Sequence, residues 1–241
     1  MADIHINTPE EIEGMRRVGR KASELLDFIT PYVKAGVTTL ALDKLMLEYT
    51  VDEKKVLKNG DIVNIDITIV DEDGYYGDNS RMFEIGKPTI AGHRLCEATF
   101  ECMWKGIEAV RPGNCFNDIG IACQKYCDSL GLSVVKEYGG HGIGRHVFHG
   151  EPHVSHSPIA TPTAEFKPGM IFTIEPMVNA GRRHIMDLND GWTVVTKDRS
   201  LSAQWELEVL VTETGYDILT VSKGSREAPA WVKGWKKPHF D

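Results

Sequence analysis

The first half of the chain carries two aspartates at positions where a plain strand would not need them. The stretch NIDITIVDEDGYYGDNS, residues 64–80, is typical of a β-hairpin, with alternating isoleucines before the turn residues DEDG. Asp66 lies on the strand face opposite the isoleucines, and Asp78 follows the turn. An odd-length loop places both carboxylates on one face, whereas a two-residue Asp73-Gly74 turn places them on opposite faces.

On one face the two carboxylates would repel each other unless a cation lay between them. The hairpin alone leaves a plainer interpretation open, in which Asp78 is a turn acid and Asp66 is half exposed. The remainder of the chain has to decide between the two.

Histidines occur in a glycine-rich segment of the second half. His141 and His149 lie in EYGGHGIGRHVFHGEP, residues 137–152, with His146 between them. Glycines allow the backbone to approach a ligand closely, so this segment is suited to binding. A single histidine in such a place would more often be structural.

Two glutamates in β-prone segments complete a possible ligand set. Glu175 ends the apolar segment IFTIEP, and Glu206 lies in SAQWELEVLV, where Glu208 shares its face but could simply be solvated. Four carboxylates and one imidazole form a hard, oxygen-rich shell, and their charge balances two divalent cations such as Co, Mn, Fe or Zn. A water bound to such ions is a nucleophile near neutral pH. We therefore expect a pair of metal ions held by Asp66, Asp78, His141, Glu175 and Glu206.

The composition bounds the kind of protein. With 241 residues, 41% of them hydrophobic, the chain suits one large domain or two tightly packed halves. The net charge of −8 and the lack of a Lys/Arg block argue against nucleic-acid binding. Five cysteines, no signal-peptide pattern and no long apolar run predict a cytoplasmic protein with reduced thiols and no membrane contact. We also expect a monomer.

The pattern of elements predicts an α+β fold. Thr8 and Glu11 form a capping box at the start of a helix that ends before Pro31. From about residue 133 the chain consists of strands and turns, and GWTVVTKD and SAQWELEVLVTETG are interpreted as an antiparallel pair. Strands and helices do not alternate one for one, which argues against a doubly wound sheet. The predicted helices cover residues 9–29, 39–49, 91–110 and 117–130, and the predicted hairpin covers residues 61–85.

Several sequence blocks closely resemble type I methionine aminopeptidases, of the M24 metallopeptidase family. These blocks are GDIVNIDITIV, GYYGDNSRMF, GGHGIGR, FHGEP, KPGMIFTIEPM and DGWTVVTKDRSLSAQWE, and the resemblance runs from Thr8 to about Thr220. It implies a pita-bread fold, with pseudo-symmetric halves and a curved antiparallel sheet flanked by helices. It also implies hydrolysis of the initiator methionine from peptides and nascent chains at a dinuclear metal site.

The resemblance assigns roles to individual residues. Asp78 and Glu206 resemble the bridging ligands, and Glu175 resembles a ligand of the same metal as His141 that also acts as general base. His149 resembles the histidine that contacts the substrate. Two residues resemble walls of the methionine pocket, namely Phe148 and Trp192.

The chain also departs from the family pattern. Between the second helix and the hairpin the family has about thirty further residues, which carry a catalytic histidine and part of the methionine pocket. Here LDKLMLEYTVDEKKVLKNGDIVNID runs almost straight through, with no histidine between His5 and His93. One extra residue between His141 and His149 makes His146 a rival for the role of His149, and Leu207 stands where the family commonly has histidine.

These departures leave alternatives open. The chain could be an active aminopeptidase with reduced activity, or a non-catalytic relative that binds metal or peptide and has lost part of the pocket. A third hypothesis, a proline dipeptidase, is disfavoured by the GWT and SAQ blocks.

The chain is expected to form one catalytic domain over residues 1–222, followed by a tail over residues 223–241. The tail contains Trp231 and Trp235 among lysines. It either touches a partner such as a ribosomal surface, packs on its own domain or is disordered.

Overall fold

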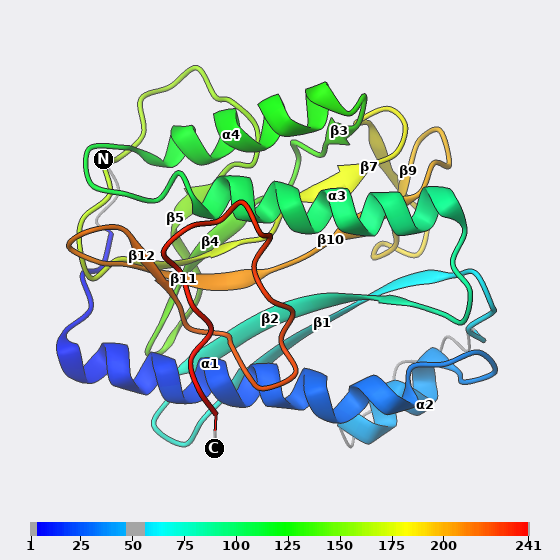
Figure 1. Cartoon of the computed structure of the whole chain (residues 1–241), viewed down its shortest axis with the longest axis horizontal. Helices are drawn as coiled ribbons and strands as arrows, with labels where there is room; N and C mark the ends of the chain where they lie inside the picture. Colours follow the sequence, from blue (N-terminus) through cyan, green and yellow to red (C-terminus); the bar gives the residue numbers. More distant parts are fainter. Residues whose placement is uncertain (1–3, 47–55, 241) are drawn as a thin grey trace.

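The computed structural model of the protein describes residues 4–46 and 56–240 (Figure 1). Helix α1 (Pro9–Ile29) begins at the predicted capping box, in which the Thr8 side chain accepts a hydrogen bond from the Glu11 N–H. A 3₁₀ turn, η1 (Thr30–Tyr32), follows it. The next helix, α2 (Thr39–Met46), starts where predicted, but its predicted end at Tyr49 and the shortened segment lie outside the described residues.

Strands β1 (Ile62–Val70) and β2 (Tyr76–Glu84) form the predicted hairpin. Val70 pairs with Tyr76, so the loop has the odd length that gives paired residues equal parity. Asp66 faces Ser80 across the pair, and Thr68 faces Asp78. The two aspartates therefore share one face of the hairpin, as neighbours on the diagonal.

Two long helices cover the opposite side of the molecule from α1 (Figure 1). Helices α3 (Ile90–Ile107) and α4 (Phe116–Ser129) lie side by side, and both end within three residues of the predicted positions. Together with the sheet they enclose the largest apolar cluster, whose centre includes Trp104, Ile107, Ile119, Phe172 and Ile174.

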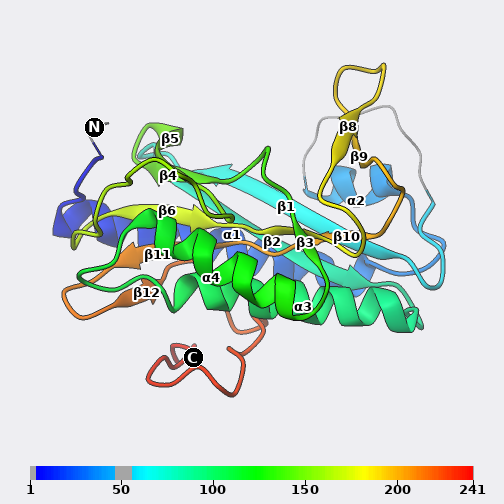
Figure 2. The same ribbon diagram turned by 90° about the horizontal axis from the view of Figure 1, so that it is seen from above.

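The main sheet has five strands in the order β12-β11-β6-β4-β5, all antiparallel to their neighbours. A three-stranded sheet, β10-β7-β3, and a small hairpin, β8-β9, complete the described strands. Figure 2 shows this small hairpin projecting from the body of the molecule. The bounds in the main sheet are β4 (Gly140–Gly144), β5 (Val147–Val154), β6 (Ile171–Ile174), β11 (Leu207–Val211) and β12 (Tyr216–Ile218). The others are β3 (Ser133–Val134), β7 (Met177–Asn179), β8 (Ile185–Asp187), β9 (Val194–Thr196) and β10 (Ser202–Gln204).

One predicted strand pairing is wrong. The segments GWTVVTKD and SAQWELEVLVTETG do not pair with each other, because β9 pairs with β8. The second segment is also divided at Trp205 and Glu206, so that β10 joins β7 whereas β11 joins β6 and β12. The break in the strand places Glu206 between two sheets.

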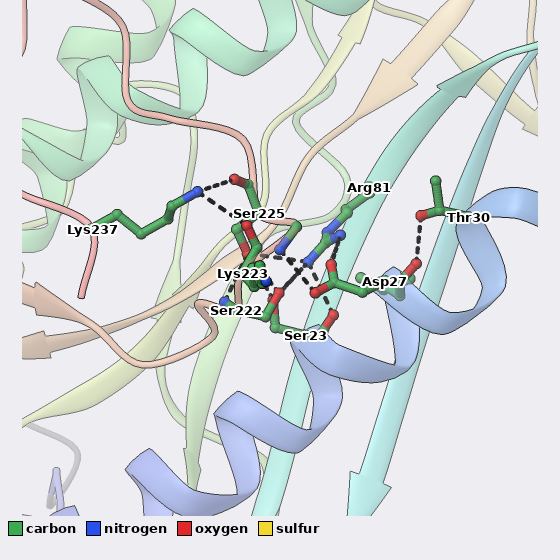
Figure 3. A network of polar contacts seen from close by, with 10 residues as sticks. Ser23, Asp27, Thr30, Arg81, Ser222, Lys223, Ser225 and Lys237 are labelled. Carbon is green, nitrogen blue, oxygen red and sulfur yellow. Dashed lines mark hydrogen bonds and ion pairs between the residues drawn. The ribbon is translucent and has the colours of Figure 1, made fainter. Parts of the chain in front are cut away.

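The C-terminal segment after residue 222 packs against the domain. The Trp235 ring lies 5.1 Å from that of Trp104, and Arg226 forms an ion pair with Glu97 on α3. Figure 3 shows the polar network that joins this segment to α1 and β2: the Arg81 guanidinium donates to Asp27 and to Ser225. Of the alternatives for the tail, packing on its own domain is the one that the structure shows.

No helix among the described residues is long and apolar enough to cross a membrane.

Candidate active site

Five elements bring the predicted ligands together. Asp66 comes from β1, Asp78 from β2 and His141 from β4, whereas Glu175 directly follows β6 and Glu206 lies between β10 and β11. All five line one cavity of about 770 Å³. The structure thus brings together, at one site, every side chain that was predicted to hold the metals.

The meeting of β2 with β11 positions the two most central carboxylates. Ser80 and Glu206 form an antiparallel bridge, in which the Glu206 N–H donates to the Ser80 carbonyl at 3.4 Å. Asp78 lies two residues before Ser80 and points to the same face. Asp78, from the first half of the molecule, therefore lies close to Glu206, from the second half.

The ligand atoms are within coordinating reach of one another. His141 Nε2 lies 3.5 Å from Asp78 Oδ2 and 3.5 Å from Glu175 Oε1. Ligand atoms of Asp78, His141 and Glu206 all lie within 4.8 Å of one another. The other ring nitrogen, His141 Nδ1, is 3.2 Å from the Gly142 carbonyl, and donation to that oxygen leaves Nε2 free to act as a ligand.

The two glutamates of the site, Glu175 and Glu206, are buried enough for their pKa values to rise. Burial raises the pKa of Glu175 from its ordinary value to about 7. Burial and the charges of Glu175 and Asp78 raise the pKa of Glu206 well above its ordinary value. Glu206 is only 1% exposed, and its Oε2 has no hydrogen-bond partner in the described part of the chain.

Asp66 differs from these acids in its exposure. Burial and the nearby charge of Asp78 raise the pKa of Asp66 to about 6. The residue nevertheless keeps an exposed surface toward the cavity. Water reaches this carboxylate from the cavity, and the nearby charge of Asp78 favours its protonated form.

The site attracts positive charge. Burial alone would lower the pKa of His141, but its hydrogen bond with Asp78 and the charge of Glu175 outweigh that effect, and the pKa rises. The pKa of the His141 imidazole is therefore raised, as are the pKa values of Glu175 and Glu206. Divalent cations would take the place of these protons and would satisfy the free oxygen of Glu206, so the residues present fit a metal centre.

Further side chains orient Glu175. The Thr173 hydroxyl donates to Glu175 Oε1 at 2.7 Å, and the Gln204 amide donates to Oε2 at 3.2 Å. The Glu175 N–H donates to Nε2 of His156 at 3.0 Å. Burial lowers the pKa of His156 to about 3, which keeps this ring neutral and able to accept.

Sequence reasoning missed these supporting residues. Thr173 was recognisable, since it stands two positions before Glu175 on the same strand face. His156 reaches Glu175 from the bend after β5 and Gln204 reaches it from β10, and no local pattern indicates such contacts.

The residues predicted to contact substrate lie at the open side of the same cavity. Phe148, His149 and Trp192 all line it. The His149 ring lies 4.4 Å from that of His141, and burial together with the charge on His141 lowers the pKa of His149. Phe148 stacks on Tyr76 at 5.5 Å, whereas Trp192, between β8 and β9, is 89% exposed.

His146 does not line this cavity. Its N–H donates to the Gly74 carbonyl at 2.7 Å, in the turn of the β1-β2 hairpin. A Cβ added to Gly74 would lie 2.1 Å from the His146 ring, so this ring packs on the turn. The placement favours His149 over His146 as the residue that faces the metal ligands.

Glu208 corrects one expectation. The alternative that this side chain is solvated is wrong, since Glu208 is 0% exposed. Burial raises the pKa of Glu208 well above its ordinary value.

A second group of possible ligands lies outside the cavity. Glu84, His93 and Glu97 come within 4.8 Å of one another. Both oxygens of Glu97 accept hydrogen bonds from Arg226, and His93 Nδ1 lies 2.9 Å from a Glu84 oxygen. These contacts satisfy the group without a metal ion.

Residues 45–213 match Metallopeptidase family M24, and the chain belongs to this family. More narrowly, its relatives are methionine aminopeptidases: the chain is 47% identical over 252 residues to the methionine aminopeptidase of Escherichia coli (strain K12), covering 91% of this chain and 95% of the relative. The crystal structure of methionine aminopeptidase from Rickettsia prowazekii has a TM-score of 0.86 and 42% identity, covering 91% of this chain and all of that one.

A more distant structure is similar in fold alone. Prolidase from Pyrococcus furiosus has a TM-score of 0.68 and 21% identity, covering 90% of this chain and 66% of that one.

The similarity to solved methionine aminopeptidases shows that the fold is α+β of the pita-bread type, as predicted. Membership of a metallopeptidase family implies the use of divalent metal, and Asp78, His141 and Glu206 form a group that could hold an ion.

The comparison also bears on the shortened segment. The alignment with the E. coli relative spans 252 positions. Because 91% of the 241 residues of this chain, about 219, are aligned, about thirty positions of the relative have no counterpart in this chain. This agrees in size with the predicted deletion. Its predicted place, just after α2, falls in the part of the chain that is not described.

Proposed function

We infer that this protein is a metal-dependent aminopeptidase that removes the N-terminal methionine from peptides and nascent polypeptides. The observation that carries this inference is the convergence of four carboxylates and one imidazole on a single cavity, from five separate elements. The methionine aminopeptidases of similar sequence support the choice of substrate. A non-catalytic binding role is disfavoured, because the whole ligand set is retained.

We propose that the centre holds two divalent ions, of Co, Mn, Fe or Zn. Asp66, Asp78, His141, Glu175 and Glu206 would hold them. The charge of four carboxylates matches two such ions, and oxygen with imidazole is a donor set that all four metals accept. When bound, the ions would polarise the methionyl carbonyl and lower the pKa of a water molecule.

Glu175 would move the proton during hydrolysis. The residue is 9% exposed, and in the metal-free protein its pKa of about 7 lies near the working pH that suits a general base. Thr173 and Gln204 each donate to one of its oxygens and so fix its orientation. Glu175 would take a proton from the attacking water and pass it to the leaving amine.

His149 would assist by hydrogen bonding. Its ring lies beside that of His141 and faces the cavity, and its lowered pKa keeps it neutral, with one N–H to donate. We propose that this N–H stabilises the charge that develops on the substrate carbonyl or on the leaving group.

The methionine side chain would lie against Phe148 and Trp192. Met177 and Tyr138 line the same cavity and add apolar surface. Because Trp192 is largely exposed, this part of the pocket is more open than the metal-ligand side. We therefore expect weak binding of the peptide.

The test is hydrolysis of Met-Ala-Ser by protein freed of metal with a chelator and then supplied with Co²⁺ or Mn²⁺. We expect release of free methionine that depends on added metal and is lost in Asp78→Ala. The matched control is Glu84→Ala, which removes an acid of the second cluster and should leave hydrolysis unchanged. Metal binding without turnover would contradict the proposed activity, and cleavage of Ala-Pro but not Met-Ala-Ser would indicate a proline dipeptidase.

A further inference from the structure

Glu208 is an acid with no role in the proposed reaction, yet it lies directly behind a proposed metal ligand. It belongs to β11 and is fully buried. Its Oε1 accepts a hydrogen bond from the Asp78 N–H at 2.6 Å. This contact joins the two halves of the molecule at the site where their ligands meet.

The geometry of the two strands explains the contact. The Ser80 carbonyl accepts from the Glu206 N–H, so β2 presents this edge to the second half of the molecule. Backbone groups two residues apart point to the same edge of a strand, so the Asp78 N–H also points toward β11. The Glu208 side chain supplies the acceptor there, in the way that a backbone carbonyl would in a continued sheet.

The surroundings hold Glu208 in place. Its N–H donates to the Thr220 hydroxyl at 2.9 Å, and its carbonyl accepts from the Leu219 N–H at 3.0 Å. Helix α1 passes close by at Gly19, where an added Cβ would lie 3.1 Å from Glu208 Oε2 and 2.9 Å from the Leu219 carbonyl. A glycine at this point of α1 leaves the room that the carboxyl group needs.

We propose that Glu208 is a positioning residue that fixes Asp78 relative to Glu206. The positions of both proposed ligands then depend on β11. Glu206 directly precedes this strand, and the Asp78 N–H donates to the side chain of Glu208 within it. Without that acceptor the buried N–H of Asp78 would lose its partner, and β2 would shift to regain one. The Asp78 carboxylate would move with its backbone, away from the position in which it shares a cation with Glu206.

The test measures metal binding as well as turnover, because the inference rests on the proposed metal centre. Glu208→Met removes the acceptor and keeps the volume, whereas Glu208→Gln keeps an oxygen that accepts from Asp78. Metal-free protein is titrated with Co²⁺ and followed by the visible absorption of the bound ion. We expect Glu208→Met to bind Co²⁺ about tenfold more weakly or worse, in the range typical of outer-shell partners, and Glu208→Gln to stay near the wild type.

Kinetics supply a second readout. Glu208→Met should lower kcat for Met-Ala-Ser and leave KM nearly unchanged, since Glu208 does not line the cavity. Thr99→Val is the control for general destabilisation, because it removes the buried hydrogen bond that the Thr99 hydroxyl donates to the Leu95 carbonyl within α3. It should lower Tm without weakening Co²⁺ binding.

Two results would overturn the role of Glu208: Co²⁺ affinity in Glu208→Met equal to that of the wild type, or a loss in Glu208→Gln as large as in Glu208→Met. If Glu208→Met does not fold, Gly19→Ala takes its place, because the added methyl group would lie 3.1 Å from Glu208 Oε2 and 2.9 Å from the Leu219 carbonyl, and would press on the segment that holds Glu208. We expect weaker Co²⁺ binding in Gly19→Ala, and unchanged binding would count against the proposal. A wild-type protein that binds no Co²⁺ would instead refute the metal centre itself.

Discussion

The two regions that supply the proposed ligands differ in how firmly they hold them. In the second half, Glu206 is 1% exposed beside β11, and Glu175 accepts hydrogen bonds from Thr173 and Gln204. In the β1-β2 hairpin, Asp66 stands on a strand whose only partner among the described strands is β2, and its side chain is exposed to the cavity.

Asp78 is held by both regions: its carboxylate accepts a hydrogen bond from Thr68 in the hairpin, and its N–H donates to Glu208 in the second half. It is 4% exposed and its N–H donates to Glu208, whereas Asp66 is exposed to the cavity. The difference indicates that the second half holds most of the proposed ligands in place, and that the hairpin completes the proposed metal site. An exposed ligand on an edge strand can be replaced by water more readily than a buried one.

The comparison predicts unequal losses when the two sides are mutated. Glu206→Gln should lower kcat/KM for Met-Ala-Ser by about 1000-fold or more, equivalent to about 4 kcal/mol of transition-state stabilisation. Asp66→Asn should cost less, because water can reach its position and complete the shell. Hydrolysis at saturating Co²⁺ measures both, and a loss in Asp66→Asn that equals or exceeds the loss in Glu206→Gln would contradict the asymmetry.

The histidines test whether the glycine-rich loop acts through His149. His149→Ala should reduce kcat by about 10²–10³, the usual cost of losing one donor to a developing charge. His146→Ala is the matched control, since this ring packs on the hairpin turn and should leave kcat within about twofold of the wild type. The assignment fails if the two variants exchange these effects.

The metal-free protein should become less stable as pH rises, because of Glu175. Its pKa is raised from 4.5 to about 7, so the folded state binds a proton more tightly than the unfolded state. The stability is therefore fully present below pH 4.5 and falls as the pH rises toward 7, by about 3 kcal/mol for this group alone. Urea unfolding with chelator at pH 5 and pH 7.5 measures the change.

Two variants sharpen that measurement. The side chain of Glu175→Gln cannot titrate, so the free energy of unfolding of this variant should fall less with pH, by about the 3 kcal/mol attributed to Glu175. Added Mn²⁺ should reduce the fall in the wild type, because a bound cation replaces the proton. Equal pH dependence in Glu175→Gln and wild type would remove Glu175 as the cause.

The open side of the cavity should show the smallest effects. Trp192→Ala should raise KM by only a few-fold with kcat unchanged, because a side chain that is 89% exposed contributes little buried apolar area. Phe148→Ala should raise KM more, since Phe148 stacks on Tyr76 and lies beside His149. Steady-state kinetics with Met-Ala-Ser separates the two, and a tenfold or greater rise in KM for Trp192→Ala would show that the pocket closes more tightly than the structure indicates.

The sequence predicted which acids and histidine converge on the cavity better than it predicted the residues that support them. Asp66, Asp78, His141, Glu175 and Glu206 were identifiable because carboxylates and glycine-framed histidines are unusual in strand-rich segments. Whether the two aspartates share a face stayed open, because that depends on the loop between Val70 and Tyr76.

The roles of residues that act across sheets were not predictable. Glu208 alternates with apolar residues in its strand, a pattern typical of a solvated side chain. The packing of α1 and β2 against β11 buries it. The pairing of β9 with β8, and the break at Glu206, likewise depend on which strand lies adjacent in space. Such partners are separated by many residues or belong to different sheets, so no local pattern reports them.

The most direct test of the central claim is X-ray diffraction at the manganese absorption edge, from crystals grown with Mn²⁺. The account predicts two anomalous peaks in the cavity of about 770 Å³, bounded by the oxygens of Asp66, Asp78, Glu175 and Glu206 and by Nε2 of His141. No peak in that cavity, or peaks confined to Glu84 and His93, would contradict it.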